Sequence, residues 1–200
     1  MGVTGLSPDS FKNMQLNAGI FIEDFDYDDI TTVAALKTAI ETARSAGKVF
    51  GATVGDGSFQ CTPETRQIEA NGMRYPIIGS TVIDSWDIQL TGTMKEITGA
   101  NFKRVLATAS STTTGAVTKI TMRTDVLASD YLNNVVWIGD MLDTGLVLIG
   151  LKNAMNTNGA NFTFTDKGEG SLPFEFHAHC ATLADMANAP VDILLFAPTT

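Results

Sequence analysis

Short stretches of alternating polar and apolar residues recur along most of this chain, and they restrict the possible folds more than any other feature. The longest of them ends near residue 98 and separates its apolar from its polar side chains. The apolar residues of this stretch are Trp86, Ile88, Leu90 and Met94, and the polar ones are Asp87, Gln89, Thr91, Thr93 and Lys95. Because successive side chains of a β-strand point to opposite faces, this pattern predicts a long strand with one face in the core and a polar opposite face.

Further candidate strands follow at short intervals and are separated by turns that contain Gly, Asn or Asp. One begins with Ile20-Phe21-Ile22, and the later ones are expected at residues 117–123, 135–138, 146–151, 162–165, 174–180 and 191–196. Such frequent strands, accompanied by only one or two helices, indicate a mainly β fold of the β-sandwich or barrel-like kind rather than an alternating β-α-β fold.

A chain of 200 residues, of which 44% are hydrophobic, fits a single domain that buries a sizeable core. We find no internal repeat and no interdomain linker. Residues 1–19 are polar and contain glycine, so we expect them to form an N-terminal arm and residues 20–200 to form the single domain. Within that domain, the stretch at 108–115 is low in complexity and rich in Ser and Thr, which predicts a flexible loop.

One long helix interrupts the strand pattern. Its apolar residues recur with the 3.6-residue spacing of a helix at Val33, Leu36, Ile40 and Ala43. We expect Asp28 or Asp29 to cap its N-terminus and Gly47 to end it. A second, short helix is predicted to begin after Thr98 and to carry Phe102, Val105 and Leu106.

The only two histidines of the chain fall in one alternating segment, in which Glu175, His177 and His179 share a face of the predicted strand. Imidazoles two residues apart on a strand can converge on one zinc or iron ion, although a further ligand would have to be a distant carboxylate. The same alternation is typical of a strand with a polar outer face whose other side chains enter the core. Those other side chains are Phe174, Phe176, Ala178 and Cys180. We favour the second interpretation, and a small metal-binding β-barrel enzyme stays as the alternative.

Two other patterns resemble ligand sites but lack the residues that such sites need. Asp24, Asp26 and Asp28 alternate like the start of a calcium-binding loop, but Asp29 and Ala35 occupy the positions of its glycine and its bidentate glutamate. The Gly-rich stretch at 51–58 lacks the Gly-Lys-Ser/Thr of a phosphate-binding loop and is predicted to be a turn. A Gly-x-Ser-x-Gly nucleophile motif is also missing from the sequence. We therefore expect no catalytic, cofactor-binding or metal-binding residues, and no enzymatic activity.

The chain is acidic, with 22 acidic against 13 basic residues and a formal net charge of -9. Because proteins hold nucleic acid through clustered Lys and Arg side chains, this composition argues against tight DNA binding and predicts a surface that repels phosphate. Cys61 and Cys180 lie far apart and are expected to be buried free thiols, with one disulfide as the alternative. We recognise neither a signal peptide nor an apolar run of membrane-spanning length.

The order of the motifs between residues 51 and 98 resembles that of one protein family. A glycine turn at Gly51, Gly55 and Gly57 is followed by a segment from Thr62-Pro63-Glu64 to Ile68-Glu69-Ala70-Asn71-Gly72, and then by the long strand, which ends in Lys95-Glu96-Ile97-Thr98. This order is similar to that of the major tail tube proteins of long-tailed, siphovirus-like bacteriophages. In that family a glycine turn, a "PE-R-IE-DG" run and a Trp-containing strand follow one another. Here Asn71 replaces the commoner Asp, which leaves the turn chemistry intact.

Weaker likenesses to the same family extend over residues 130–139, 151–154, 176–179 and 190–193, so they cover nearly the whole chain. The alanine-rich helix before Gly51 is less typical of the family. The resemblance implies a structural virion protein whose β-sandwich-like domain, with a flanking helix and flexible arms, assembles into hexameric rings. Inner strands of each ring would form a continuous barrel around a lumen, and stacked rings would form the tail tube that conducts the genome into the host cell.

The resemblance also implies the partners and the location. The partners would be further copies of the chain, the tail terminator, tape measure and baseplate proteins, and double-stranded DNA that passes through the lumen without specific binding. The location would be the virion tail, after assembly in the host bacterial cytoplasm, with no membrane and no cofactor. Six copies at -9 each would give a ring about -54 in charge, an acidic conduit if part of that charge faces the lumen.

Other assignments stay open at this point. The inner tube of a contractile tail or of a phage-like injection system would have the same motifs. A binding module, such as a capsid decoration or adhesin domain, would use a similar sandwich as a monomer or a small oligomer. The metal-binding enzyme would depend on Glu175, His177 and His179.

Overall fold

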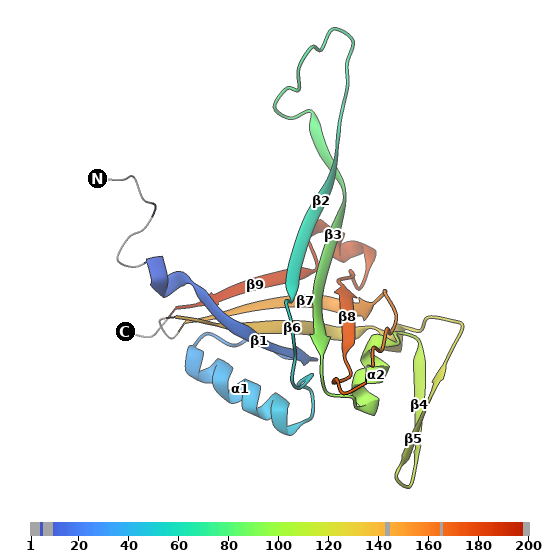
Figure 1. Cartoon of the computed structure of the whole chain (residues 1–200). Coiled ribbons are helices and arrows are strands. Elements are labelled where there is room, and N and C mark those ends of the chain that lie inside the picture. Colours follow the sequence, from blue (N-terminus) through green and yellow to red (C-terminus); the bar gives the residue numbers. More distant parts are fainter. Residues whose placement is uncertain (1–4, 6–9, 143–144, 165, 198–200) are drawn as a thin grey trace.

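The computed structural model describes residue 5 and residues 10–142, 145–164 and 166–197. Within this part of the chain there are nine strands, two α-helices and three short 3-10 helices (Figure 1). The strands are β1 (Gln15–Glu23), β2 (Ser58–Gln67), β3 (Thr81–Met94), β4 (Ala109–Thr114), β5 (Val117–Met122), β6 (Leu132–Met141), β7 (Leu146–Asn156), β8 (Leu172–His177) and β9 (Val191–Phe196). The helices are α1 (Val33–Ser45), α2 (Gly99–Val105), η1 (Ser10–Asn13), η2 (Ala128–Asp130) and η3 (Leu183–Ala187).

Seven of the strands form one antiparallel sheet in the order β1-β6-β7-β8-β3-β2, with β9 paired to β7. The strand β7 joins two parts of this sheet, because its first residues pair with β9 and its last two, Met155 and Asn156, pair with β8. In Figure 1, β1, β6, β7 and β9 form a first layer, and β2, β3 and β8 cross it as a second layer. β4 and β5 make a separate hairpin. The predicted mainly β, sandwich-like fold is therefore confirmed.

The hydrophobic core has two parts, one on each face of the first layer. Neighbouring residues of β1 contribute to both, because Phe21 and Ile22 point to opposite faces of the strand. Between the layers, Phe174 meets Phe21 and Phe50 edge-on, with ring centroids 4.9 and 5.6 Å away. On the other face, Ile22 packs in the cluster that contains Leu36 of α1, and both side chains are fully buried.

The ends of α1 are set by local hydrogen bonds. Its N-cap is Thr32, whose hydroxyl oxygen accepts a hydrogen bond from the backbone N–H of Ala35 at 3.2 Å. The predicted caps Asp28 and Asp29 are wrong, because both lie in the preceding turn and are too far from the first free N–H groups of the helix. Gly47 follows the last turn in the left-handed conformation, with a φ of 71°, as predicted for the residue that ends the helix.

The predicted apolar faces of both helices are confirmed. In α1 the predicted residues Val33, Leu36, Ile40 and Ala43 are all buried or partly buried in the second cluster, together with Ala39. In α2 the hydroxyl oxygen of Thr98 accepts from the backbone N–H of Asn101 at 3.1 Å, and Val105 is fully buried between the layers. Each helix therefore begins at a threonine cap and buries one apolar side.

Several strands differ from the prediction in their bounds. β9 has the predicted bounds, and β5 differs from them by one residue. β6 and β7 are longer than predicted. β3 ends at Met94 rather than near residue 98, and β8 ends at His177 rather than at residue 180. β1 begins at Gln15, inside the expected arm, because residues 15 and 16 pair with β6 beyond a register shift. At 162–164, the described part of another predicted strand, there is only a single bridge between Thr163 and Ser171. The arm residues 1–4 and 6–9 lie outside the described residues.

Two stretches that were not predicted to be strands form hairpin arms. The flexible loop predicted at 108–115 is wrong, because residues 109–114 form β4 and pair with β5 along its full length. The Thr side chains of this stretch are β-branched, which favours extended backbone even where nothing covers it. β2 was also missed, since Pro63 interrupts its pattern. A proline without an N–H is tolerated there because β2 is an edge strand of the sheet.

The two cysteines are free thiols, as predicted, but the prediction that both are buried is wrong. Cys61 is exposed, because it lies on the part of β2 that extends past the core, and Cys180 is partly exposed. No helix in the described part of the chain is long and apolar enough to cross a membrane.

Candidate functional site

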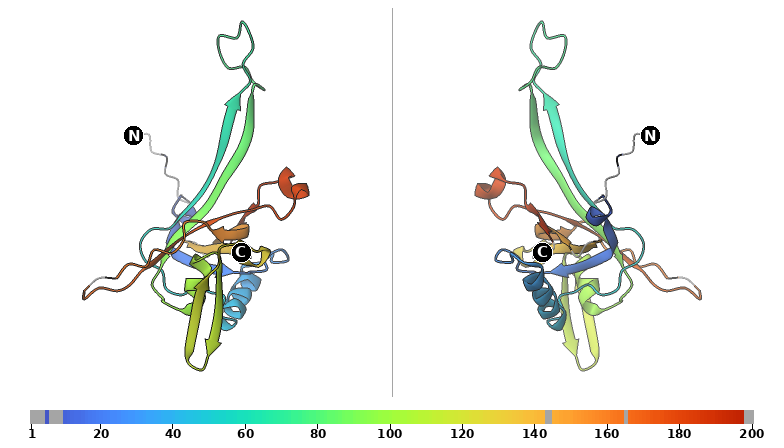
Figure 2. Two further views of the ribbon diagram at one scale, coloured as in Figure 1. Left: turned by 90° about the vertical axis from the view of Figure 1, so that its right-hand side faces the viewer. Right: turned by 90° about the vertical axis from the view of Figure 1, so that its left-hand side faces the viewer.

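The most prominent surface feature is the β2–β3 hairpin, which projects far from the two-layered body (Figure 1, Figure 2). The segment that connects its strands, residues 68–80, is named the hairpin tip below. The tip and the adjoining part of β3 carry large apolar side chains that are exposed to solvent: Ile68, Tyr75, Ile77, Ile78, Ile83 and Trp86. An exposed apolar surface of this kind is typical of a protein–protein interface.

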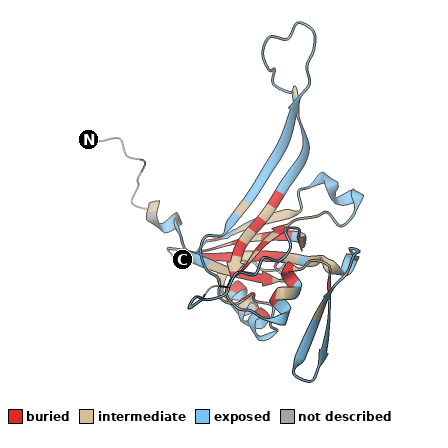
Figure 3. Ribbon diagram, turned by 45° about the vertical axis from the view of Figure 1, so that its right-hand side comes forward, coloured by how far each residue is buried: buried red, intermediate tan, exposed pale blue. Residues whose placement is uncertain are grey.

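β3 leaves the core between Trp86 and Ile88. On its apolar face, Ile88, Leu90 and Met94 are 3%, 2% and 0% exposed, which confirms that part of the prediction. Trp86 lies on the same face but is 46% exposed, so its assignment to the core is wrong. The upper part of the strand is exposed because the first layer lies beneath only its lower part (Figure 3).

Outside the core, the hairpin is held by its backbone ladder and by polar cross-strand pairs. β2 pairs over its full length with residues 81–91 of β3, with one register shift after Glu64. Arg66 Nε donates to Asp84 Oδ1 at 3.0 Å, and the Ser85 hydroxyl donates to Glu64 Oε2 at 2.8 Å. Exposed pairs of this type stabilise a fold by less than about 1 kcal/mol each. The ladder therefore determines the direction in which the hairpin projects.

The sheet made by β2, β3 and β8 has one apolar face, which covers the core, and one polar face. The ladder puts Ser58 opposite Thr91, Gln60 opposite Gln89 and Thr62 opposite Asp87, and it puts Glu175 and His177 of β8 opposite Thr91 and Gln89. Directly paired residues of antiparallel strands point to the same side of the sheet. The polar sheet face, as these eight residues are called below, is therefore rich in hydroxyl, amide and carboxylate groups.

The structure does not bring together all three residues of the alternative metal site, Glu175, His177 and His179. His177 lies between two carboxylates, with Nε2 3.0 Å from Glu175 Oε1 and Nδ1 3.3 Å from Asp87 Oδ1. His179 lies beyond the end of β8, where the alternation stops, and its Nδ1 is 3.1 Å from the carbonyl oxygen of Asn153. Among the described residues, no group of three or more His, Cys, Asp and Glu side chains is placed to hold a metal ion.

The acidic segment that follows β1 is packed more tightly than its charges suggest. Asp26 and Asp28 are exposed, but Phe25 and Tyr27, which alternate with them, are buried in the cluster beneath α1. The Tyr27 hydroxyl donates to Asp192 Oδ2 at 3.0 Å. Burial, together with the negative charge of Asp192, raises the pKa of Tyr27 well above its usual value. The segment therefore anchors β1 to β9 and does not form a calcium-binding loop.

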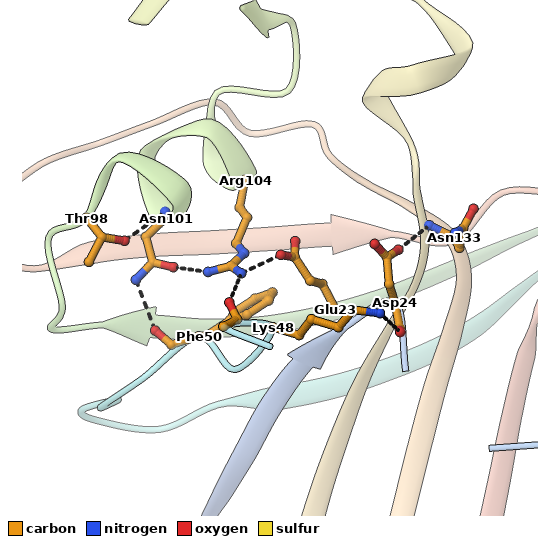
Figure 4. Close-up of polar contacts among 9 residues, drawn as sticks. Glu23, Asp24, Lys48, Phe50, Thr98, Asn101, Arg104 and Asn133 are labelled. Atoms are coloured by element: carbon orange, nitrogen blue, oxygen red, sulfur yellow. Dashed lines mark hydrogen bonds and ion pairs between the residues drawn. The ribbon is translucent and has the colours of Figure 1, made fainter. Parts of the chain in front are cut away.

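A buried polar cluster connects α2 with β1, and sequence analysis missed it (Figure 4). Arg104 is almost fully buried; its guanidinium donates to Glu23, to Asn101 and, at 3.1 Å, to the carbonyl of Gly47, and it lies 4.9 Å from the ring centre of Phe50. Glu23 and Arg104 are 81 residues apart, and no local pattern links them. These bonds join α2 to β1 and to the turn that follows α1, and they fix the position of α2 in the fold.

The Gly-rich stretch at 51–58 was predicted to be a turn. Residues 51–57 form an irregular connection that includes a bridge between Thr53 and Met94, whereas Ser58 is already the first residue of β2. Gly51 has a φ of 87°, a conformation that side chains disfavour, and the next backbone N–H donates to Glu96 Oε1 at 2.8 Å. The backbone of this connection also bonds to the end of β3, because the Val54 N–H donates to the carbonyl of Thr93 and the Lys95 N–H donates to the carbonyl of Ala52.

Comparison with known proteins finds no family model that matches this chain, and no curated protein that matches it. The hairpin tip and the polar sheet face are therefore the features from which a function can be inferred.

Proposed function

We propose that this protein is a structural subunit that self-assembles into stacked hexameric rings and forms the tail tube of a long-tailed bacteriophage. The observation that carries the proposal is the concentration of exposed apolar side chains on elements that project from the body. Besides the hairpin tip, these elements are the 158–170 loop with Phe164 and the segment around η3 with Leu183 and Met186 (Figure 2). Burial of such side chains against neighbouring copies is favourable, whereas a monomer leaves them in contact with water.

The size of the surface supports the same conclusion. The chain has an accessible surface of 12960 Å² for a mass of 21.3 kDa. A compact monomer of this mass exposes about 9,100 Å². The projecting hairpins contribute to the excess, and assembly would cover part of it. The open edge of β2 is a further liability that pairing between copies would remove.

The polar sheet face supports the role of a conduit. In a closed ring it would form a wall of hydroxyl, amide and carboxylate groups toward the lumen. Because the chain carries 22 acidic against 13 basic residues, six copies at -9 each would give a ring of about -54. Double-stranded DNA would then pass without specific binding, since phosphate finds no cluster of basic side chains to hold it.

This function requires no catalysis, cofactor or metal ion. The tube would conduct the genome into the host cell, with the tail terminator and baseplate proteins at its ends and the tape measure protein inside it. The protein would be assembled in the bacterial cytoplasm and would reside in the virion tail.

Assembly of the purified chain tests the proposal. Negative-stain microscopy of concentrated protein should show hollow rings or tubes, and sedimentation velocity should show growth with concentration. Replacing residues 68–80 by a two-residue Asn-Gly turn should keep the circular dichroism of the monomer and abolish assembly. A wild-type chain that stays monomeric at high concentration, or that binds DNA tightly at moderate salt, would contradict the proposal.

A further inference from the structure

Besides the projecting elements, the molecule has an apolar groove between the two layers, at the base of the β2–β3 hairpin. It has a volume of about 740 Å³, and its apolar lining comes from both layers: Phe59, Leu90, Trp137, Val147 and Ile149. The ladder between β7 and β9 puts Ile193 opposite Ile149 and Leu195 opposite Val147. These two side chains are 56% and 71% exposed and extend the apolar lining to the edge of the sheet. The seven residues together are called the inter-layer groove below.

The floor of the groove is built around one tryptophan. Trp137 donates its indole N–H to the carbonyl of Ala18 at 2.8 Å, which holds the ring against the sheet. A Cβ at Gly19 or Gly139 would lie 2.5 Å from atoms of this ring, so only glycine at both positions lets the indole lie flat. The groove is therefore an apolar surface with a fixed shape, which suits a specific partner.

We propose that the hairpin tip of a second copy of this chain occupies the inter-layer groove. The tip of the same copy cannot reach it, because the strand from Leu90 to Thr81 spans about 30 Å and points away from the body (Figure 1). Tip and groove are two different surfaces, so the contact is heterologous and propagates from copy to copy into a ring or a stack. This inference rests on the proposed self-assembly and names the surfaces that would carry it.

Charge favours this occupant over the other exposed apolar elements. The hairpin tip carries Glu69 next to β2 and Arg74 beside Tyr75, Ile77 and Ile78, so its basic group lies with its exposed apolar side chains. The groove has Asp56 in its lining. Within the described part of the chain, the side chains of Arg74 and Asp56 form no hydrogen bond or ion pair. A docked tip would therefore bring an unpaired cation next to an unpaired carboxylate as its apolar side chains fill the groove.

The competing elements match the groove less well. In the 158–170 loop, Phe162 already packs edge-on against Phe102 at 5.7 Å, and Phe164 packs against Phe162 at 5.8 Å. The segment at η3 presents Leu183 and Met186 together with an acidic residue and no basic one. The Ile78 side chain, in contrast, is as exposed as in a free peptide.

Disulfide cross-linking between two variants tests this contact. Both variants carry Cys61→Ser and Cys180→Ser; one adds Ile78→Cys and the other adds Leu195→Cys. Mixed, assembled and mildly oxidised, they should form a 78–195 disulfide that peptide mass spectrometry identifies. The matched control pairs Ile78→Cys with Val117→Cys, an exposed apolar position on the β4–β5 hairpin, and should give no link.

A charge swap gives a second, independent readout. Arg74→Glu should weaken assembly by at least about tenfold in the concentration required, and Asp56→Lys added to it should restore assembly. If wild-type tubes form but the 78–195 link does not, or forms no faster than the 78–117 control, the groove assignment is overturned and the proposed tube stands. If the wild-type chain forms no assembly at all, both proposals are overturned.

Discussion

Alanine replacement of Leu90 and of Trp86 separates the part of β3 that belongs to the core from the part that does not. The two residues lie four positions apart on the same face of one strand. Leu90 is 2% exposed and packs in the cluster between the layers, whereas Trp86 is 46% exposed. Leu90→Ala removes a buried side chain and leaves a cavity, which should lower the free energy of unfolding by about 2–5 kcal/mol. Trp86→Ala removes a larger side chain but should cost less than about 1 kcal/mol.

Urea unfolding, followed by circular dichroism at a concentration that keeps the chain monomeric, measures both effects. A domain of this size loses about 2–3 kcal/mol of stability per molar urea, so Leu90→Ala should lower the unfolding midpoint by about 1–2 M. The midpoint of Trp86→Ala should stay within about 0.5 M of the wild type. An equal loss in both variants would mean that the hairpin packs against the body in solution. An unchanged Leu90→Ala midpoint would mean that the core face of β3 is wrongly assigned.

Three further predictions concern other parts of the molecule. Arg104→Met leaves the Glu23 carboxylate mostly buried and unpaired, and should lower the free energy of unfolding by about 3 kcal/mol. Addition of Glu23→Gln removes the unpaired charge and should recover part of that loss, as measured by thermal unfolding. Because burial raises the pKa of Tyr27, the contribution of this residue to stability is fully present below pH ~10 and is lost at higher pH. Urea titrations should therefore show that the stability of the Tyr27→Phe variant falls less steeply above pH ~10 than that of the wild type. Parallel losses of stability in the two proteins would refute this. Asp87→Lys with Glu175→Lys should leave tube assembly intact and slow genome ejection from virions that carry the variant, and unchanged ejection would exclude a lumen position for the polar sheet face.

Local patterns were sufficient where a structural element depends on its own residues. The alternation of β9, the 3.6-residue spacing of α1 and the cap at Thr98 are properties of neighbouring residues, and each predicted element is present. The cap of α1 was missed by a few residues, because the aspartates before Thr32 are intrinsically at least as good N-caps, and only the backbone path selects Thr32.

The candidate site was predictable only in part. The alternation in β3 and β8 predicted a polar face that carries Glu175 and His177, but it also grouped His179 with them, and the end of β8 separates that residue. The Thr-rich strand at 109–114 was predicted to be a loop because its low-complexity composition is typical of loops, and it is stabilised by pairing with β5 and not by a core.

The sequence by itself determined the elements whose apolar residues repeat every two or every three to four residues, such as β9 and α1, and the apolar face of each. It did not identify β2 and β4 as strands. Only the tertiary structure decided how far each apolar face is covered. Trp86 and Leu90 have the same pattern, yet the first layer reaches only one of them. Likewise, the pairing of Glu23 with Arg104 joins residues 81 positions apart, and such contacts depend on the crossing of the two layers, which no short-range periodicity specifies.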